Sequence, residues 1–237
     1  MSTPRTPEAL LRAVAERLGD FRERLMFVGG SVTWLLLTDP VARQQAPRPT
    51  TDVDAVVDVT TKAQYDALAP TLRALGFTED DRPGAPLCRW RAGEMVLDLL
   101  PTSEDVLRFS NRWYSAAMLR CEQHELPGLG AIRVARATDL LAMKLEAFHD
   151  RGQDDLYGSK DLEDVITLID GRRELADELR SADPTLRTYI ETELGRLLAN
   201  PAFQEALSGF LPGDEGSQAR VPLLRRTLEG LAGQLPQ

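Results

Sequence analysis

The sequence predicts an α/β protein in which a mixed, twisted sheet with flanking helices is followed by a helical C-terminal region. Three stretches support this prediction. An apolar run at residues 25–28 precedes a Gly-Gly-Ser turn and a second apolar run, the pattern of a strand, a tight bend and a helix start. Residues 52–59 alternate with the two-residue period of a strand. From residue 172 onward the pattern is helical, with breaks at prolines and at a Gly/Ser-rich stretch.

The turn Gly29-Gly30-Ser31 is a candidate phosphate-binding element. Backbone N–H groups at a helix start have no partner within the helix and can bind phosphate oxygens. Taken alone, the same three residues also describe an ordinary tight turn with a helix cap, which is the commoner structure. The turn therefore gains weight only from the residues around it.

Two acidic residues on the alternating strand form a candidate metal site. The two-residue period places Asp52 and Asp54 on the same face of the strand. Neighbouring carboxylates repel each other unless a cation or protons lie between them, so the pair favours a divalent metal. The plain alternative is the solvated face of an edge strand, the role that we expect for Asp58.

A third carboxylate follows in a predicted hairpin. Residues 87–91 and 94–100 are short runs on either side of an Ala-Gly bend, which is typical of a β-hairpin. Asp98 lies on the mainly apolar second strand, where burying an unpaired charge is costly. We therefore expect Asp98 to be the third metal carboxylate.

The other elements are assigned from their start and stop residues. Thr6-Pro7 is expected to start a helix whose apolar face packs on the sheet. The proline-containing stretch 39–50 is expected to be a loop beside the site, and residues 131–134 an edge strand. Further helices are expected at residues 62–75, 140–150 and 159–171, the last capped by Ser159. We expect a core region at residues 1–135 and a helical region at 136–237 that completes the site.

The chain is acidic, with a formal net charge of -9. This charge opposes non-specific binding to nucleic acid, whose phosphates usually meet a basic surface. A local basic patch remains possible, because five arginines fall near the start, namely Arg5, Arg12, Arg17, Arg22 and Arg24. No run approaches the roughly 18 apolar residues of a membrane span, and the N-terminus has no apolar leader segment. We therefore expect a cytoplasmic protein without membrane contact, and we interpret Cys88 and Cys121 as unpaired thiols.

The combination of Gly29-Gly30-Ser31, Asp52-x-Asp54 and a third aspartate after a hairpin resembles the polymerase-beta-like nucleotidyltransferase superfamily. The segment from Lys144 to Gly152, followed by residues 159–164, resembles the AbiEii/AbiGii-type nucleotidyltransferase toxins of abortive-infection and toxin-antitoxin systems. The resemblance covers roughly residues 25–171 and leaves both termini outside.

The resemblance implies a two-metal transfer from a nucleoside triphosphate such as ATP. In that mechanism Asp52, Asp54 and Asp98 hold two Mg²⁺ ions, one acting on the acceptor hydroxyl and the other on the leaving pyrophosphate. The Gly29-Gly30-Ser31 turn grips the triphosphate. Lys144 stabilises its charge, with Asp161 contributing to the site and Asp164 more structural. The plain alternative for Lys144 is a helix lysine whose stem lies on apolar surface while its ammonium stays in water.

Three functions remain open at this point. The first is a toxin-like enzyme that modifies tRNA or a protein hydroxyl and has a possible cognate antitoxin. The second is a transferase for a small cationic molecule of the aminoglycoside kind, which an acidic chain would attract. The third is a non-catalytic, antitoxin-like interaction protein, against which a full set of three acids argues.

Overall fold

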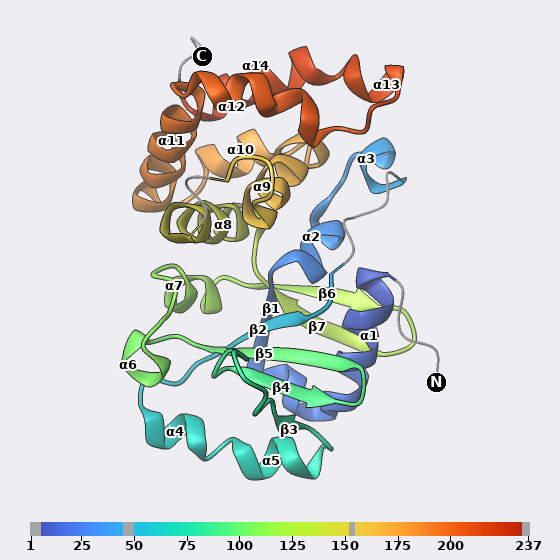
Figure 1. Ribbon diagram of the computed structural model, residues 1–237, viewed down its shortest axis with the longest axis vertical. Coiled ribbons are helices and arrows are strands. Elements are labelled where there is room, and N and C mark those ends of the chain that lie inside the picture. Colours follow the sequence, from blue (N-terminus) through green and yellow to red (C-terminus); the bar gives the residue numbers. More distant parts are fainter. Residues whose placement is uncertain (1–5, 45–49, 152–154, 234–237) are drawn as a thin grey trace. The chain divides into compact units, whose positions relative to one another are not determined.

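The chain folds into two units, and the computed structural model describes residues 6–44, 50–151 and 155–233 of it (Figure 1). The first unit comprises residues 1–35 and 47–136, and the second comprises residues 36–46 and 137–237. The chain thus leaves the first unit after residue 35, returns at residue 47 and leaves again after residue 136. The sequence prediction of regions 1–135 and 136–237 places residues 36–46 in the first region, whereas they cluster with the second unit.

The first unit contains a seven-stranded mixed sheet with the order β3-β4-β5-β2-β1-β7-β6. Strand β2 pairs antiparallel with β1 and parallel with β5, and β1 pairs parallel with β7. This mixed sheet with helices confirms the predicted fold class. The strands are β1 (Leu25–Val28), β2 (Val53–Val57), β3 (Thr78–Glu79), β4 (Arg89–Ala92), β5 (Met95–Pro101), β6 (Glu122–Leu126) and β7 (Gly130–Val134).

Helices of the first unit pack on this sheet. The Thr6 hydroxyl accepts a hydrogen bond from the Ala9 N–H at 3.1 Å and so starts α1, as predicted. Helix α1 buries its apolar face and contacts β5 and β2. The helices are α1 (Pro7–Leu18), η1 (Gly19–Arg24), α2 (Gly30–Leu36), which leads out of the unit, α4 (Lys62–Asp66), α5 (Ala69–Ala74), α6 (Glu104–Leu107) and α7 (Tyr114–Met118).

Two sequence predictions in this unit were wrong. The helix expected at residues 62–75 is divided into α4 and α5, because Pro70 has no N–H to continue the helical ladder. The strand at residues 130–134 is not an edge strand, since β7 lies between β1 and β6. The edge strand at this end of the sheet is β6, whose sequence EQHEL gives only a weak apolar signal.

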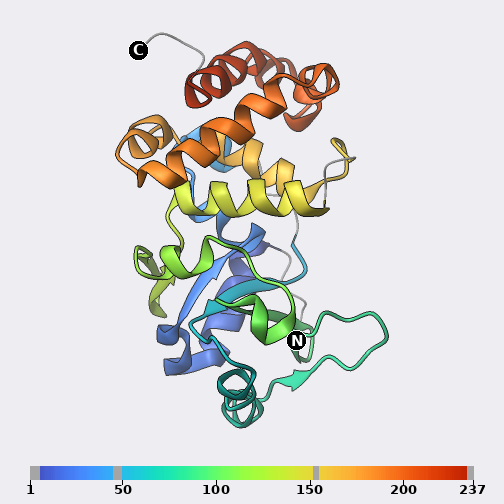
Figure 2. The same cartoon turned by 90° about the vertical axis from the view of Figure 1, so that its left-hand side faces the viewer.

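The second unit is helical, as predicted for the C-terminal region. Ser159 caps α9 by accepting a hydrogen bond from the Leu162 N–H at 3.3 Å. Figures 1 and 2 show α8 beside α9 and α11, which it also contacts. The helices are α3 (Pro40–Gln44), α8 (Ala137–Arg151), α9 (Lys160–Gly171), α10 (Leu175–Arg180), α11 (Pro184–Leu198), α12 (Pro201–Ala206), η2 (Leu207–Phe210), α13 (Glu215–Gln218) and α14 (Val221–Leu231).

The loop expected at residues 39–50 contains the short helix α3. Asp39 acts as its cap, because its carboxylate accepts hydrogen bonds from the N–H groups of Val41 and Ala42, and Pro40 suits the first helical position. The Asp39 backbone N–H also donates to the Gly171 carbonyl at 2.9 Å, which ties the segment to the end of α9. Residues 45–49 of the expected loop lie outside the described part of the chain. In the ranges that are described, no helix has both the length and the apolar character needed to cross a membrane.

Candidate functional site

The glycine turn after β1 lies directly beside Asp54. Val28, the last residue of β1, is paired with Asp54 in the antiparallel register of β1 and β2. Gly29 follows with φ of 76°, a conformation that side chains rarely adopt. A Cβ at this position would lie 2.0 Å from Oδ2 of Asp54. Glycine is therefore required at position 29 both by its backbone conformation and by the aspartate next to it.

The rest of the turn is partly closed. Gly30 is half-buried and begins α2, while Ser31 is fully buried. The Ser31 hydroxyl points back to the Val28 carbonyl, 3.5 Å away. Of the three turn residues predicted to bind nucleotide, Gly29 and Gly30 thus line the bend itself, and the Ser31 side chain faces the interior.

Asp54 and Asp98 lie side by side on neighbouring strands. They are register partners in the parallel pair of β2 and β5, so their side chains project from the same face of the sheet, with the strands about 4.8 Å apart. Asp98 is 7% exposed, in keeping with the predicted burial of this acid. Asp52 precedes β2 by one residue. The sheet therefore brings the predicted carboxylates together at the Gly29 turn.

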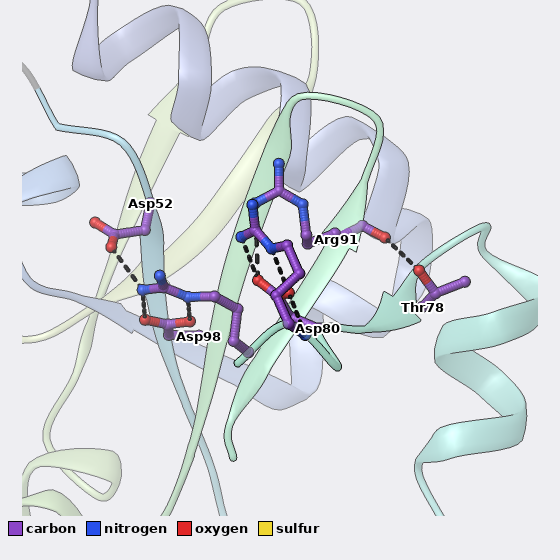
Figure 3. Close-up of polar contacts among 7 residues, drawn as sticks. Asp52, Thr78, Asp80, Arg91 and Asp98 are labelled. Atoms are coloured by element: carbon purple, nitrogen blue, oxygen red, sulfur yellow. Dashed lines mark hydrogen bonds and ion pairs between the residues drawn. The ribbon is translucent and has the colours of Figure 1, made fainter. Parts of the chain in front are cut away.

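Sequence reasoning missed Arg89, which binds two of these acids. Its guanidinium binds both Asp52 and Asp98, the two acids that Figure 3 labels beside each other. Nη2 is 3.0 Å from Oδ2 of Asp52 and 2.6 Å from Oδ2 of Asp98, and Nε donates to Oδ1 of Asp98 at 2.8 Å. Both oxygens of Asp98 are thus bound by one guanidinium, the strongest geometry for such a pair. We call Asp52, Asp98 and Arg89 the Arg89 cluster.

The hydrogen bonds to Asp98, followed by the charges of Asp98 and Asp52, raise the pKa of Arg89 above its ordinary value. Arg89 is therefore a permanent cation of the cluster. Its position follows from the hairpin. Ala92 pairs with Met95 next to the bend, and three residues farther from the bend on each strand Arg89 pairs with Asp98. That register was within reach of the sequence once the hairpin was predicted.

The arrangement of the acids does not fit a bound metal ion as it stands. Three carboxylates are donors of the right chemical type for Mg²⁺. The Arg89 guanidinium, however, holds the oxygens of Asp98 that a metal would need. Within residues 6–44, 50–151 and 155–233, no group of three or more His, Cys, Asp or Glu side chains is arranged to hold a metal ion. Metal binding by Asp52, Asp54 and Asp98 therefore stays a prediction.

A second group of ion pairs joins Arg91 of β4 to the segment that follows β3. Asp80 binds the Arg82 guanidinium at 2.5 Å and lies 3.8 Å from Nη1 of Arg91 (Figure 3). The hydrogen bond from Arg82 lowers the pKa of Asp80 to about 2. Arg91 lies two residues beyond Arg89 and therefore on the same face of β4, yet its ion pair is with Asp80.

The second unit contains Lys144 and Asp161, which the resemblance assigned to the site. The Lys144 ammonium lies 3.0 Å from Oδ1 of Asp161 and 2.7 Å from Oδ2 of Asp164, between α8 and α9. All three residues are buried. We call them the Lys144 cluster. The alternative of a lysine with its ammonium in water is therefore wrong. Asp161 and Asp164 both bind this one ammonium, so these contacts do not separate a site role for Asp161 from a structural role for Asp164.

The arginines near the start of the chain are largely engaged in structural contacts. Arg12 donates to the Pro127 carbonyl at 2.6 Å, and Arg22 donates to the Leu129 carbonyl at 3.1 Å. Arg17 lies 3.5 Å from the Leu75 carbonyl, and Arg24 lies over the ring of Phe21. Arg5 lies outside the described residues. These contacts tie the predicted basic patch to loops of the first unit.

Neither a protein-family model nor a curated protein matches the sequence. Among solved structures, the chain is similar to an antigenic nucleotidyltransferase-like protein from Paracoccidioides brasiliensis, with 19% identity, a TM-score of 0.47 and coverage of 86% of this chain and 91% of that chain. It is similar to ANT(2")-Ia in complex with adenylyl-2"-tobramycin, with 12% identity, a TM-score of 0.47 and coverage of 80% and 97%. A putative nucleotidyltransferase from H. pylori gives 14% identity, a TM-score of 0.46 and coverage of 96% and 91%. At these values, function has to be argued from the residues of the chain itself.

Proposed function

We propose that the chain is a nucleotidyltransferase that transfers a nucleotide from a nucleoside triphosphate to a hydroxyl acceptor. The observation that carries the proposal is the meeting of a glycine turn with Asp54 and Asp98 on three adjacent strands. A tight turn at a helix start suits phosphate oxygens, and carboxylates beside it suit a proton acceptor or a cation. Neither element would be specific alone, but the sheet places them in contact.

In the proposed reaction the acceptor hydroxyl attacks the α-phosphorus of the triphosphate. A new bond forms between the acceptor oxygen and the α-phosphorus, and the bond to the oxygen that bridges to the β-phosphorus breaks, so that pyrophosphate leaves. The hydroxyl proton goes to a carboxylate, for which Asp54 is placed beside the Gly29 turn. The turn orients the phosphates so that attack occurs in line.

Charge requires a further cation. The Asp52 and Asp98 carboxylates share one guanidinium, so this pair of acids and its arginine is net negative, and a triphosphate adds more negative charge. Binding is favourable only if added positive charge offsets this repulsion. Donors that are all oxygen select hard cations, so Mg²⁺ is the cation that the proposal names.

The roles of Lys144 and Asp161 in the proposal rest on the resemblance to the toxin family. Their contacts in the second unit, with each other and with Asp164, support a structural role at least as well. We therefore assign the transfer chemistry to the first unit and treat the Lys144 cluster as the part of the proposal that its own variants must test.

For the acceptor, the resemblance favours a tRNA or protein hydroxyl, with the chain acting as the toxin of a toxin-antitoxin or phage-defence system. A second candidate is a small cationic acceptor of the aminoglycoside kind. The net charge of -9 favours it, as does the engagement of Arg12 and Arg22 with backbone carbonyls. The set of three acids beside a glycine turn argues against the third candidate, a non-catalytic, antitoxin-like role.

The test is a transfer assay with α-labelled nucleoside triphosphates, Mg²⁺ and three acceptor classes, namely bulk tRNA, proteins and aminoglycosides. We expect the wild-type chain to label one class and Asp54→Asn to lose about 100-fold or more in rate, because the change removes a charge at constant size. Asp58→Asn is the matched control, since Asp58 follows the same strand and binds the Thr102 hydroxyl instead. Absence of label and of pyrophosphate release with every acceptor would overturn the proposal.

A further inference from the structure

Arg89 and a metal ion need the same oxygen atoms. The guanidinium binds both carboxylate oxygens of Asp98 and one oxygen of Asp52. A divalent cation held between these acids would coordinate those oxygens at about 2.0–2.6 Å, which leaves no room for a guanidinium on the same atoms. The cluster can therefore hold one cation or the other.

We propose that Arg89 is the resident cation of this cluster and that a divalent cation reaches Asp98 by displacing it. The inference deepens the nucleotidyl-transfer function proposed above and rests on it, because the exchange serves a reaction only if the chain transfers nucleotides. In this scheme Arg89 offsets part of the negative charge of the acids until the metal arrives, and metal binding is weakened by the presence of Arg89.

Burial explains why the cluster needs a cation at all times. The Asp98 side chain is 10% exposed, and its strand is apolar on both sides of it. A carboxylate in such a place is costly to leave unpaired, and Asp54 lies next to it as a like charge. Removing Arg89 without a replacement therefore leaves repelling acids, whereas replacing it with a metal satisfies them.

Exposure explains why Arg89 can leave. Its side chain is 22% exposed, and the Asp52 side chain that it also binds is 30% exposed. The contact with Asp52 has access to water and is weak in net terms, so the bidentate contact with Asp98 is the one that a metal ion has to outcompete. A long arginine stem at the start of β4 can turn into water without a change in the strand. The exchange thus needs only a side-chain movement.

The test is a Mn²⁺ titration of the full chain without nucleotide, followed by the spin resonance signal of free Mn²⁺. If Arg89 occupies the acids for most of the time, apparent affinity is reduced by the fraction of time that they are available. We expect Arg89→Gln to bind Mn²⁺ about 10-fold or more tightly than the wild type. Arg91→Gln is the matched control, because Arg91 lies on the same face of the same strand and pairs with Asp80. It should bind Mn²⁺ as the wild type does.

Equal Mn²⁺ affinity of the wild type and Arg89→Gln would overturn the inference, as would absence of binding in both. Adding Asp98→Asn to Arg89→Gln should abolish the gain, and a gain that persists would place the metal elsewhere and also overturn it. Transfer activity is a separate readout. Tighter Mn²⁺ binding by Arg89→Gln, with no transfer by the wild type, would uphold the exchange and defeat the proposed function. Transfer by the wild type, with equal Mn²⁺ affinities of the two proteins, would uphold the proposed function and defeat the exchange.

A measurement on the unaltered side chain covers the case in which Arg89→Gln does not fold. The Nε–H resonance of Arg89, assigned by its loss in Arg89→Lys, reports the hydrogen bond to Asp98. Millimolar Mg²⁺ should move this resonance to the position of a solvated arginine and speed its exchange with water. A resonance that stays unchanged while Mg²⁺ binds would show that Arg89 and the metal do not compete.

Discussion

The two units each hold a cation between two aspartates, and the clusters differ in their access to water. In the first unit the Arg89 side chain is 22% exposed and that of Asp52 is 30% exposed. In the second unit the Lys144 side chain is 11% exposed, with Asp161 at 10% and Asp164 at 7%. Asp98, at 10%, is as buried as Asp161, so the clusters differ at the cation and at one acid: Arg89 and Asp52 are partly open to solvent, whereas Lys144 and Asp164 are closed.

The exposure of the cation decides which cluster can exchange its partner. A buried ion pair that loses one member leaves an uncompensated charge away from water, which is strongly destabilising. A pair at the surface loses much less, because water solvates the group left behind. By this criterion the Arg89 cluster is suited to ligand exchange, and the Lys144 cluster holds α8 against α9.

The largest effect is expected from removing the buried cation. Lys144→Met keeps the apolar stem and deletes the buried charge that both Asp161 and Asp164 bind. We expect the free energy of unfolding to fall by about 3–5 kcal/mol, measured by urea denaturation. A loss below about 1 kcal/mol would show that the Lys144 cluster is as open as a surface pair.

The control for this change is Lys62→Met. Lys62 pairs with Asp66 one helical turn away, and both side chains are more than half exposed. We expect its removal to change stability by less than about 0.5 kcal/mol. Combining Lys144→Met with Asp161→Asn and Asp164→Asn should recover part of the loss, because the repelling charges are then gone.

The second largest effect is expected at the turn beside the Arg89 cluster. Gly29→Ala adds a Cβ at a φ of 76° and forces it to within 2.0 Å of the Asp54 carboxylate. We expect a loss of about 2–4 kcal/mol, from left-handed backbone strain plus overpacking. Transfer activity should fall with it, because Asp54 must move.

Gly93→Ala separates the two causes. Gly93 has a φ of 60° and no atom within 4 Å of where a Cβ would lie. Only backbone strain is then added, and we expect a loss of about 1–2 kcal/mol in a thermal melt. Equal losses at the two glycines would mean that Asp54 does not press on the turn.

The comparison also shows what the sequence could and could not predict. The strand, turn and helix at residues 25–36 and the caps at Thr6 and Ser159 were predicted correctly, because each is set by residues within a few positions of one another. The break at Pro70 was equally local, and it was overlooked because the apolar spacing continues across it.

The pairings of the two clusters depend on contacts between distant segments. That Asp54 lies beside Asp98 requires β2 and β5 to pair in parallel, which no local pattern fixes. Arg89 was missed although hairpin register pairs it with Asp98, because a lone arginine on a short strand has no distinctive pattern. The burial of Lys144 depends on how α9 packs against α8, so its sequence could not tell a solvated lysine from a paired one.

A smaller effect is expected from removing the exposed cation. Arg89→Gln deletes the charge between Asp52 and Asp98, but Asp52 stays in contact with water and the glutamine amide can still donate a hydrogen bond toward the buried Asp98. We expect the free energy of unfolding to fall by about 1–2 kcal/mol in the presence of a chelator, roughly the value of charged hydrogen bonds at a partly open site. Urea denaturation of Arg89→Gln and Lys144→Met under the same conditions shows which variant loses more unfolding free energy. A loss as large as that of Lys144→Met would remove the contrast between the two clusters.

The smallest effect concerns Cys88, the residue directly before Arg89. It is seen in the rate of thiol modification and not in stability. Cys88 directly precedes Arg89 and is 3% exposed. Burial, followed by the charges of Asp98 and Asp54, raises the pKa of Cys88 to about 12. Cys121 is half-buried. Because the thiolate is the reactive form, we expect one thiol per chain to react with a disulfide reagent at pH 8 and both to react after unfolding. Cys121→Ser should remove the reaction of the native chain.

If Cys88 instead reacted as fast as Cys121, β4 would be opening. Departure of Arg89 from the acids would then reflect local unfolding of the strand and not the movement of one side chain.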